Sequence, residues 1–384
     1  MITRLTIFPN GCWSRNENGV YVEPSAPLLF DPLLENKINI ELVSEERSID
    51  DNYSHFSYRS HSLSFRSLGV AKSYKNKWRR GLRYIFRLYP VFRAVNASQF
   101  CYLFLPSHTG LIAASFCKLL RRPYAIYLRG DIQKLGCSRL WSVYDRFIAD
   151  SSFVLTTGQQ LNEQVQMLNQ RSEPVIPMSP VLNLNDEGRV DASRDDKFRI
   201  LYIGQMVEEK GIFDLLTAFD SVVKKTEQQS ELIMVGDGAD LNRLKYLIRE
   251  RDLCDKVRCT GFVSEPDKLV SFYKNASLFV FPSYYPEGFP RVLYEAMRFS
   301  VPIITTPVGQ VPYLMKDGYD ALFTEMRDPD CLAHRINELV IDREWREEIS
   351  KNGSNTVKGI ANEWKNQSHG DQVVAWLKKL GFSA

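Results

Sequence analysis

The chain has 384 residues, of which 44% are hydrophobic and 25% are charged, and its formal net charge is +3. This composition excludes a disordered or fibrous protein, and the length suits two domains of ordinary size. The nearly balanced charge gives no general support to nucleic-acid binding, so only local clusters of basic residues can indicate an anionic partner.

The cysteines and the first residues bear on the compartment. The seven cysteines are odd in number and form no Cys-x-x-Cys pair. They favour a reducing cytosol over a disulfide framework or a zinc site. The opening run MITRLTIFPNG is expected to be a first β-strand that ends in a turn. It is too short and too quickly broken to be a signal peptide. No apolar run approaches the roughly 20 residues that span a bilayer, so we expect a cytoplasmic protein.

The segment 71–95, AKSYKNKWRRGLRYIFRLYPVFRAV, contains no acidic residue and interleaves basic with aromatic side chains. This pattern is typical of an amphipathic helix that binds an anionic membrane surface at the inner face. Nucleic-acid binding uses similar residues, and a surface helix that packs its aromatic residues on its own domain is the plainest alternative. We favour the membrane and expect no nucleic-acid partner. The residues expected to meet the lipid are Lys75, Lys77, Trp78, Arg79, Arg80, Arg83 and Arg87.

Strands and helices alternate in the rest of the first half. Apolar runs predict strands at 100–106, 123–130 and 152–158, and helices are expected at 110–120 and 159–169. Alternation of this kind predicts an α/β fold with a parallel sheet.

The second half repeats the alternation after a polar stretch. A strand, a turn and a helix are expected within 198–225, and the pattern continues through 230–250, 257–264, 276–283 and 301–307. This spacing is typical of a doubly wound fold. We therefore expect four parts: an N-terminal domain at 1–182, a linker at 183–197, a C-terminal domain at 198–360, and a helix within 361–384 that returns to the N-terminal domain.

The run PSYYPEGFPRVLYEAM (282–297) places two glutamates, Glu287 and Glu295, eight positions apart around a proline-glycine turn. Ligands of open α/β sheets bind beyond the carboxyl ends of the strands, where this turn is expected. Gly288 allows backbone to approach a ligand closely, and Pro290 fits the start of a helix. The free N–H groups at that start, near Arg291 and Val292, suit a phosphate.

The two carboxylates fit the hydroxyl groups on either side of such a phosphate. Glu295, just over one turn inside the helix, can accept two hydrogen bonds from a ribose diol. Glu287, in the loop, can accept hydrogen bonds from a sugar. A ribose, a diphosphate and a sugar in this order describe a nucleotide-sugar, although two glutamates at this spacing also occur on ordinary solvated surfaces.

This stretch, with VPIITTPVGQVPYL and DG after it, resembles the donor-site signature of the family 4 retaining glycosyltransferases, which have a Glu-x7-Glu motif inside EGFPxxxxEAM. The resemblance covers about 198–325 strongly and the first half only in pattern. It implies two Rossmann-like domains that face each other across a cleft, the GT-B architecture. It also implies that Glu295 binds the ribose and that Glu287 binds the donor sugar near the reaction centre.

The resemblance extends to shorter elements of the second half. GQMVEEKG (204–211) is similar to the family's GR…KG element, which makes Lys210 a cation against the diphosphate. A lysine acts on phosphate as a point charge. The full set of residues expected to bind the donor is Gly11, Gly204, Gln205, Lys210, Gly236, Phe262, Val263, Glu287, Gly288, Phe289, Pro290, Arg291, Val292 and Glu295. The family implies no metal and no cofactor, since the nucleotide-sugar is a substrate.

The first half is expected to bind the acceptor. His108 follows the predicted strand 100–106, and Arg129 and Asp131 follow the strand 123–130, where the family often has a histidine. These three residues complete the expected catalytic set with Glu287 and Lys210. His108 and Asp131 can equally be ordinary residues at helix starts.

The expected function is a retaining transfer of a hexose-type sugar from a nucleotide-sugar to a hydroxyl of a glycan or polyprenyl-linked acceptor, in bacterial surface polysaccharide biosynthesis. Two alternatives stay open, a nucleotide-sugar 2-epimerase and a catalytically degenerate relative that binds a nucleotide-sugar or a partner protein. The catalytically degenerate relative stays open because the sequence departs from the family pattern, with Gln205 where an arginine is usual. Ser300, Gln310 and Tyr313 also depart from it.

Overall fold

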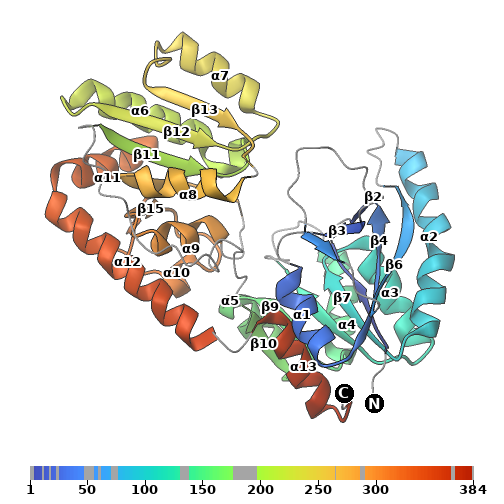
Figure 1. The fold of residues 1–384 in the computed structure, drawn as a ribbon. Coiled ribbons are helices and arrows are strands. Elements are labelled where there is room, and N and C mark those ends of the chain that lie inside the picture. Colours follow the sequence, from blue (N-terminus) through green and yellow to red (C-terminus); the bar gives the residue numbers. More distant parts are fainter. Residues whose placement is uncertain are drawn as a thin grey trace. The chain divides into compact units, whose positions relative to one another are not determined.

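The chain divides into two compact units, an N-terminal unit of residues 1–178 and 365–384 and a C-terminal unit of residues 179–364. Each is a parallel sheet covered by helices (Figure 1). The computed structural model describes residues 4–10, 13–16, 19–22, 26–46, 56–58, 62–70, 77–129, 138–175, 197–263, 265–285, 290–364 and 368–382. The predicted linker at 183–197 lies outside them except for Lys197.

The main sheet of the N-terminal unit has the strand order β10-β9-β8-β7-β1-β4-β6, with all neighbours parallel. The predicted first strand and the strands predicted at 100–106, 123–130 and 152–158 are confirmed as β1, β7, β8 and β9. The strand bounds are β1 Arg4–Phe8, β4 Asn39–Glu46, β6 Leu63–Val70, β7 Phe100–Leu105, β8 Tyr124–Leu128, β9 Val154–Thr157 and β10 Ser172–Val175.

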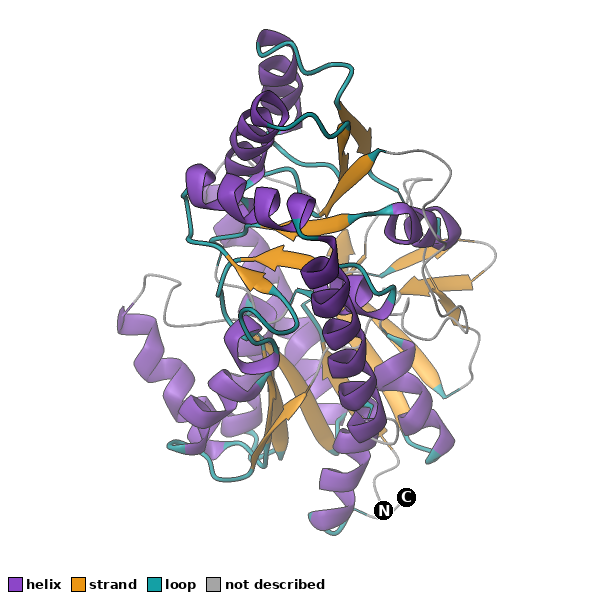
Figure 2. Cartoon of the chain, turned by 90° about the vertical axis from the view of Figure 1, so that its left-hand side faces the viewer, coloured by secondary structure: helices purple, strands orange, loops and turns teal. Residues whose placement is uncertain are grey.

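Helices cover both faces of this sheet (Figure 2). They are α1 Pro27–Glu35, α2 Lys77–Ala97, α3 His108–Leu119, α4 Ser138–Asp150, α5 Gln159–Gln166 and α13 His369–Lys379. A small antiparallel sheet, which the sequence did not predict, joins β2 Ser14–Asn16, β3 Gly19–Val22 and β5 Phe56–Tyr58.

The sheet of the C-terminal unit has the order β13-β12-β11-β14-β15-β16, again with parallel neighbours. Its strands are β11 Phe198–Ile203, β12 Ser230–Val235, β13 Val257–Gly261, β14 Leu278–Phe281, β15 Ile303–Thr305 and β16 Leu322–Phe323. Its helices are η3 Glu208–Lys210, α6 Ile212–Lys225, α7 Leu241–Glu250, α8 Pro266–Asn275, α9 Arg291–Arg298, α10 Val311–Leu314, α11 Pro329–Ile341 and α12 Arg343–Trp364.

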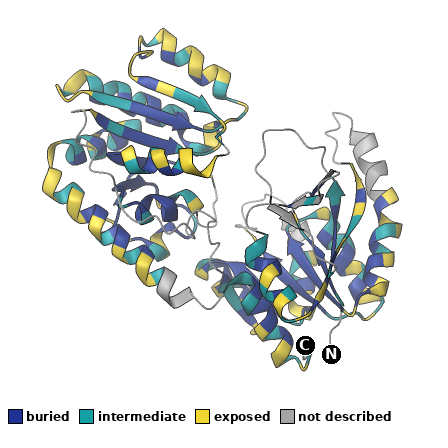
Figure 3. Ribbon diagram, viewed as in Figure 1, coloured by how far each residue is buried: buried dark blue, intermediate teal, exposed yellow. Residues whose placement is uncertain are grey.

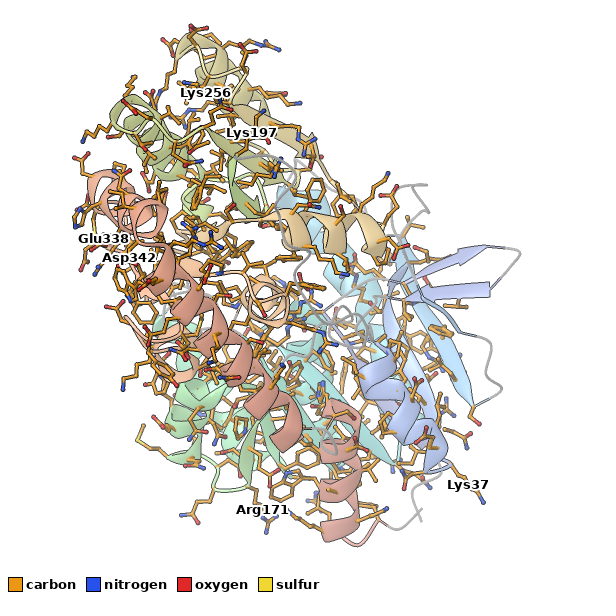
Figure 4. All side chains as sticks on the ribbon, turned by 60° about the vertical axis from the view of Figure 1, so that its left-hand side comes forward. Lys37, Arg171, Lys197, Lys256, Glu338 and Asp342 are labelled. Atoms are coloured by element: carbon orange, nitrogen blue, oxygen red, sulfur yellow. The ribbon has the colours of Figure 1, made fainter. Side chains whose placement is uncertain are left out.

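The central strands of both sheets are buried, and charged side chains extend outward from the units (Figures 3 and 4). Strand β7, FCYLFL, is buried at every position, as expected for a parallel strand covered on both faces. Its alternate residues enter two cores, Tyr102 facing α1 and α13 and Leu103 facing α2 and α3. Lys37 and Arg171 exemplify the exposed charges.

The C-terminal helix α13 belongs to the N-terminal unit and packs on α1. A capping box begins it, since the backbone N–H of Asp371 donates to the Ser368 hydroxyl and the Asp371 carboxylate accepts from the Ser368 backbone. Farther along, the Trp376 ring stacks on Phe153 with centroids 5.4 Å apart. This packing ties the end of the chain to the first sheet.

The first residue of α13, His369, is a buried imidazole. Its Nε2 lies 2.6 Å from the Tyr102 hydroxyl, and its ring centroid lies 4.3 Å from that of Tyr127. Burial, with a smaller contribution from the charge of Arg129, lowers the pKa of His369 to about 3. The unfolded chain therefore binds a proton between about pH 3 and pH 6.5 that the folded chain does not, so stability falls as the pH drops through this window.

We expect this proton linkage to remove about 2 kcal/mol of the free energy of unfolding between pH 7 and pH 5. The measurement is urea unfolding at both pH values, with His369→Phe as the comparison. We expect the variant to be less stable at pH 7, because the Tyr102 hydroxyl loses the imidazole nitrogen with which it forms a hydrogen bond. On acidification the variant should lose less stability than the wild type. Equal losses in the two proteins would show that His369 does not stay neutral in the folded state.

Candidate functional site

The winding of the C-terminal sheet determines where its ligand site is expected. The chain winds outward from β11 through β12 to β13, and in the other direction from β14 through β15 to β16. Ligands of such sheets bind beyond the carboxyl ends of the strands where the winding reverses. Here this point lies between β11 and β14, whose following loops carry the two motifs singled out in the sequence.

Hydrogen bonds join these two loops directly. The carbonyl oxygen of Glu209 accepts from the backbone N–H groups of Tyr284 and Tyr285, at 3.0 and 3.1 Å. Gly211 follows with φ +72°, and a Cβ at this position would lie 2.1 Å from the carbonyl oxygen of Pro282. A glycine is therefore required for the loops to approach this closely, and their contact positions Lys210.

The ammonium group of Lys210 lies against aromatic rings. Its Nζ is 4.7 Å from the ring centroid of Tyr285 and 6.0 Å from that of Phe281. Burial lowers the pKa of Lys210 to about 8, while the neighbouring Glu209 acts in the opposite direction. A partly desolvated cation of this kind interacts more strongly with an anion than a fully hydrated one does.

The predicted glycines at the ends of β11 and β12 are in close contact. Gly236 has φ +139°, and a Cβ there would lie 1.9 Å from the carbonyl oxygen of Gly204. Beside them, the Tyr202 hydroxyl donates to the Gln205 carbonyl at 2.9 Å, and the Gln205 side chain is exposed. At the end of β13, Phe262 is 53% exposed, beside Val263.

The predicted helix after the turn is confirmed as α9. Pro290 is its N-cap rather than its first residue, and no side-chain hydrogen bond caps the helix. Arg291 begins the helix and is exposed, and Val292 is half-buried. Glu287, Gly288 and Phe289 lie outside the residues that the structure describes.

Glu295 lies on the buried side of α9, with 9% of its surface exposed. Its Oε2 accepts a 2.8 Å hydrogen bond from the hydroxyl of Tyr273, on α8. Sequence reasoning missed both Tyr273 and Tyr285, because their partners, Glu295 and Lys210, are distant from them in the sequence.

The predicted acceptor residues of the N-terminal unit lie at the carboxyl ends of neighbouring strands. His108 begins α3 and is exposed, and the helix is capped by Ser107, whose hydroxyl accepts from Gly110 N–H at 2.9 Å. Arg129 directly follows β8 and is exposed. Its backbone N–H donates to the Leu105 carbonyl at 2.8 Å, which links the ends of β7 and β8. Gly11 and Asp131 lie outside the described residues.

The structure corrects one member of the predicted membrane set. Arg87 is 5% exposed and forms an ion pair with Glu45 of β4, so its side chain faces the sheet and not a lipid surface. Phe86 and Tyr89 are instead 78% and 67% exposed on α2. Lys75 and the side chains of Lys77, Trp78, Arg79, Arg80 and Arg83 lie outside the described part.

No group of three or more His, Cys, Asp or Glu residues in the described part could hold a metal ion. None of the helices described is long and apolar enough to cross a bilayer.

The chain resembles known glycosyltransferases in sequence. It is 27% identical to an uncharacterized glycosyltransferase of Methanocaldococcus jannaschii, over 65% of this chain and 68% of that protein. It is 33% identical to the capsular polysaccharide biosynthesis glycosyltransferase CapM of Staphylococcus aureus, over 43% of this chain but only 42% of that protein's length.

Solved structures share the fold over the whole chain. Sucrose-phosphate synthase from Thermosynechococcus elongatus superposes with a TM-score of 0.73 at 18% identity, covering 100% of both chains. Anabaena HepE in complex with UDP gives a TM-score of 0.69 at 16% identity, covering 99% of this chain and 100% of HepE. The expected GT-B class, with two Rossmann-like domains, is thereby confirmed. A family model described as glycosyl transferases group 1 matches residues 186–356 of the chain.

Proposed function

We propose that the chain is a retaining glycosyltransferase that moves a hexose-type sugar from a nucleotide-sugar to a hydroxyl of a glycan or lipid-linked acceptor. The observation that carries the proposal is the junction of the two loops at the ends of β11 and β14. It brings the Lys210 ammonium beside the segment that leads into α9 and Glu295. The family match and the capsular polysaccharide relative support a role in bacterial surface polysaccharide biosynthesis.

In the proposed reaction, the leaving diphosphate gathers negative charge as the bond to the sugar breaks. Lys210 and the first N–H groups of α9 would stabilise this charge, which is electrostatic preorganisation. Glu295 would hold the ribose and Glu287 the sugar. The acceptor hydroxyl would attack from the side on which the diphosphate leaves and pass its proton to that phosphate, which retains the anomeric configuration. We propose that transfer proceeds without a metal, and its rate should then be unchanged in EDTA.

The test is nucleotide release from a panel of UDP-, GDP- and ADP-sugars, with Glu295→Ala alongside. UDP-sugars come first because HepE, with the same fold, was solved with UDP. Slow release of one nucleotide by the wild type, reduced by the variant, supports the proposal and identifies the donor. Nucleotide binding without release would instead favour the catalytically degenerate relative. Gln310, which is 3% exposed where the family usually has glycine, would be the first residue to revert.

The proposal includes peripheral binding to an anionic membrane, at its inner face. Support comes from the basic sequence of 71–95 and from the exposed rings of Phe86 and Tyr89. Arg93 is exposed beside them, with its guanidinium carbon 6.0 Å from the Tyr89 ring centroid. Aromatic rings among basic side chains suit the headgroup region, where charge attraction and apolar burial act together.

We expect Phe86→Ser combined with Tyr89→Ser to weaken binding to phosphatidylglycerol-containing vesicles at least about tenfold. The double variant can no longer bury the two aromatic rings in the lipid. Co-sedimentation with vesicles measures this. The control is Met167→Ser, which replaces an apolar residue that is 84% exposed on another part of the same unit. If the double variant sediments like the control, α2 is an ordinary surface helix.

A further inference from the structure

A tyrosine on one helix contacts the glutamate of the proposed ribose site on the next. Tyr273 lies near the end of α8 and is 0% exposed. Its hydroxyl donates to Oε2 of Glu295 at 2.8 Å. The sequence does not indicate this pair, because Tyr273 and Glu295 are 22 positions apart and belong to different helices.

The ring of Tyr273 is held by two other aromatic residues. Phe299, the C-cap residue of α9, stacks on it with centroids 5.5 Å apart and an interplanar angle of 15°. Phe279, on β14, lies tilted against it at 5.8 Å. Because interiors are close-packed, a ring held in this way has one orientation. The position of its hydroxyl is therefore determined by the sheet and by α9 itself.

The chemistry of the pair gives each partner one role. Burial, and then the nearby Glu295, raise the pKa of Tyr273 well above its ordinary value, so the hydroxyl keeps its proton and acts as the donor. Glu295 then acts as the acceptor, which is the role that a carboxylate needs in order to bind a diol. A carboxylate already oriented in the free protein loses less conformational entropy when a ligand binds.

We propose that Tyr273 is a positioning residue, which holds the Glu295 carboxylate in the orientation that receives the ribose hydroxyls of the donor nucleotide. This inference rests on the proposed function, because it presumes that Glu295 binds a ribose. It adds to that function a residue outside the motif, which acts on the nucleotide only through Glu295.

The experiment compares the binding of UDP and of 2′,3′-dideoxy-UDP by isothermal titration calorimetry, with GDP and 2′,3′-dideoxy-GDP as the second pair. Tyr273→Phe keeps the ring and removes only the hydroxyl. We expect it to weaken binding of the ribonucleotide about threefold to tenfold, the size of one hydrogen bond. Binding of the dideoxynucleotide, which offers no diol, should change by less than about twofold.

The control variant is Tyr124→Phe, in the N-terminal unit. Tyr124 is 4% exposed, and its hydroxyl donates to the Phe147 carbonyl at 2.9 Å. This variant loses a comparable buried hydrogen bond far from α9 in the sequence, and it should bind both nucleotides like the wild type. Urea unfolding of each variant shows whether its fold is kept.

The outcomes separate the inference from the function beneath it. If Tyr273→Phe weakens both nucleotides equally, or neither, Tyr273 has only a structural role and the inference is wrong. The proposed function then stands, provided that the wild type discriminates ribose from dideoxyribose and Glu295→Ala does not. If the wild type binds none of UDP, GDP and ADP, the proposed function fails, and this inference fails with it.

Discussion

Gly211→Ala is expected to lower the free energy of unfolding of the C-terminal unit by about 2–5 kcal/mol and to abolish detectable nucleotide binding. Two costs combine. The left-handed conformation, with φ +72°, costs a residue with a Cβ roughly 1–2 kcal/mol. The new methyl group would also lie 2.1 Å from the Pro282 carbonyl oxygen, and overpacking of this kind typically costs about 1–3 kcal/mol. The loops can relieve the contact only by separating, which displaces Lys210.

A matched glycine separates these two costs. Gly318 has φ +73°, but a Cβ there would meet nothing within 4 Å. Gly318→Ala should therefore show only the conformational cost, roughly 1–2 kcal/mol. Urea unfolding and calorimetric titration with UDP or GDP measure the two effects. Equal destabilisation by the two substitutions would mean that the loops tolerate a methyl group, and that their junction is looser than the structure indicates.

Much of this site could be predicted because its information is local. The sequences of 204–211 and 282–297 each predict a strand end, a glycine turn and a helix start. The reversal of winding between β11 and β14 brings the two segments to one edge of the sheet. The partners of Lys210 and Glu295 could not be predicted in this way. Tyr285 and Tyr273 matter through side-chain contacts, and nothing in sequence spacing specifies which aromatic residue faces which charged group.

The error at Arg87 has a similar cause. Basic residues recur along 71–95, and the absence of acidic residues there suggested that Arg87 faces an anionic surface with the other residues of the expected set. The partner that buries Arg87 is Glu45, on β4, more than 40 positions earlier. A buried charge is tolerated when it is paired, so an amphipathic pattern alone cannot assign every cation of a helix to its outer face.

Replacing Lys210 by alanine is expected to reduce sugar transfer about 100- to 1,000-fold, the effect typical of removing one group that stabilises developing charge. The substitution removes the only positive charge in the sequence of 204–211, which also contains the negative charges of Glu208 and Glu209. Lys210→Arg should keep a substantial part of the activity, because a guanidinium also binds phosphate and can lie on the rings of Tyr285 and Phe281. Initial rates with the donor identified by the panel provide the measurement.

The pKa of Lys210 gives this prediction a second readout. Because that pKa is about 8 in the free protein, the ammonium loses its proton as the pH rises through this value. Nucleoside diphosphates should therefore bind more weakly at pH 9 than at pH 7. Binding should also take up a proton near pH 8, since a bound diphosphate favours the charged form. Calorimetry in buffers of different ionisation enthalpy detects this uptake. Lys210→Arg should show neither effect, because a guanidinium keeps its charge.

The stability of the protein should change in the opposite direction over the same range. The folded-state pKa of Lys210 lies below the ordinary value of 10.5, so between about pH 8 and pH 10.5 the unfolded chain binds the extra proton, and the Lys210 contribution to stability rises with pH. Weaker binding at pH 9 therefore cannot be attributed to unfolding at this residue. If Lys210→Arg loses affinity between pH 7 and pH 9 as steeply as the wild type, another group controls the binding, and the ammonium does not contact the diphosphate.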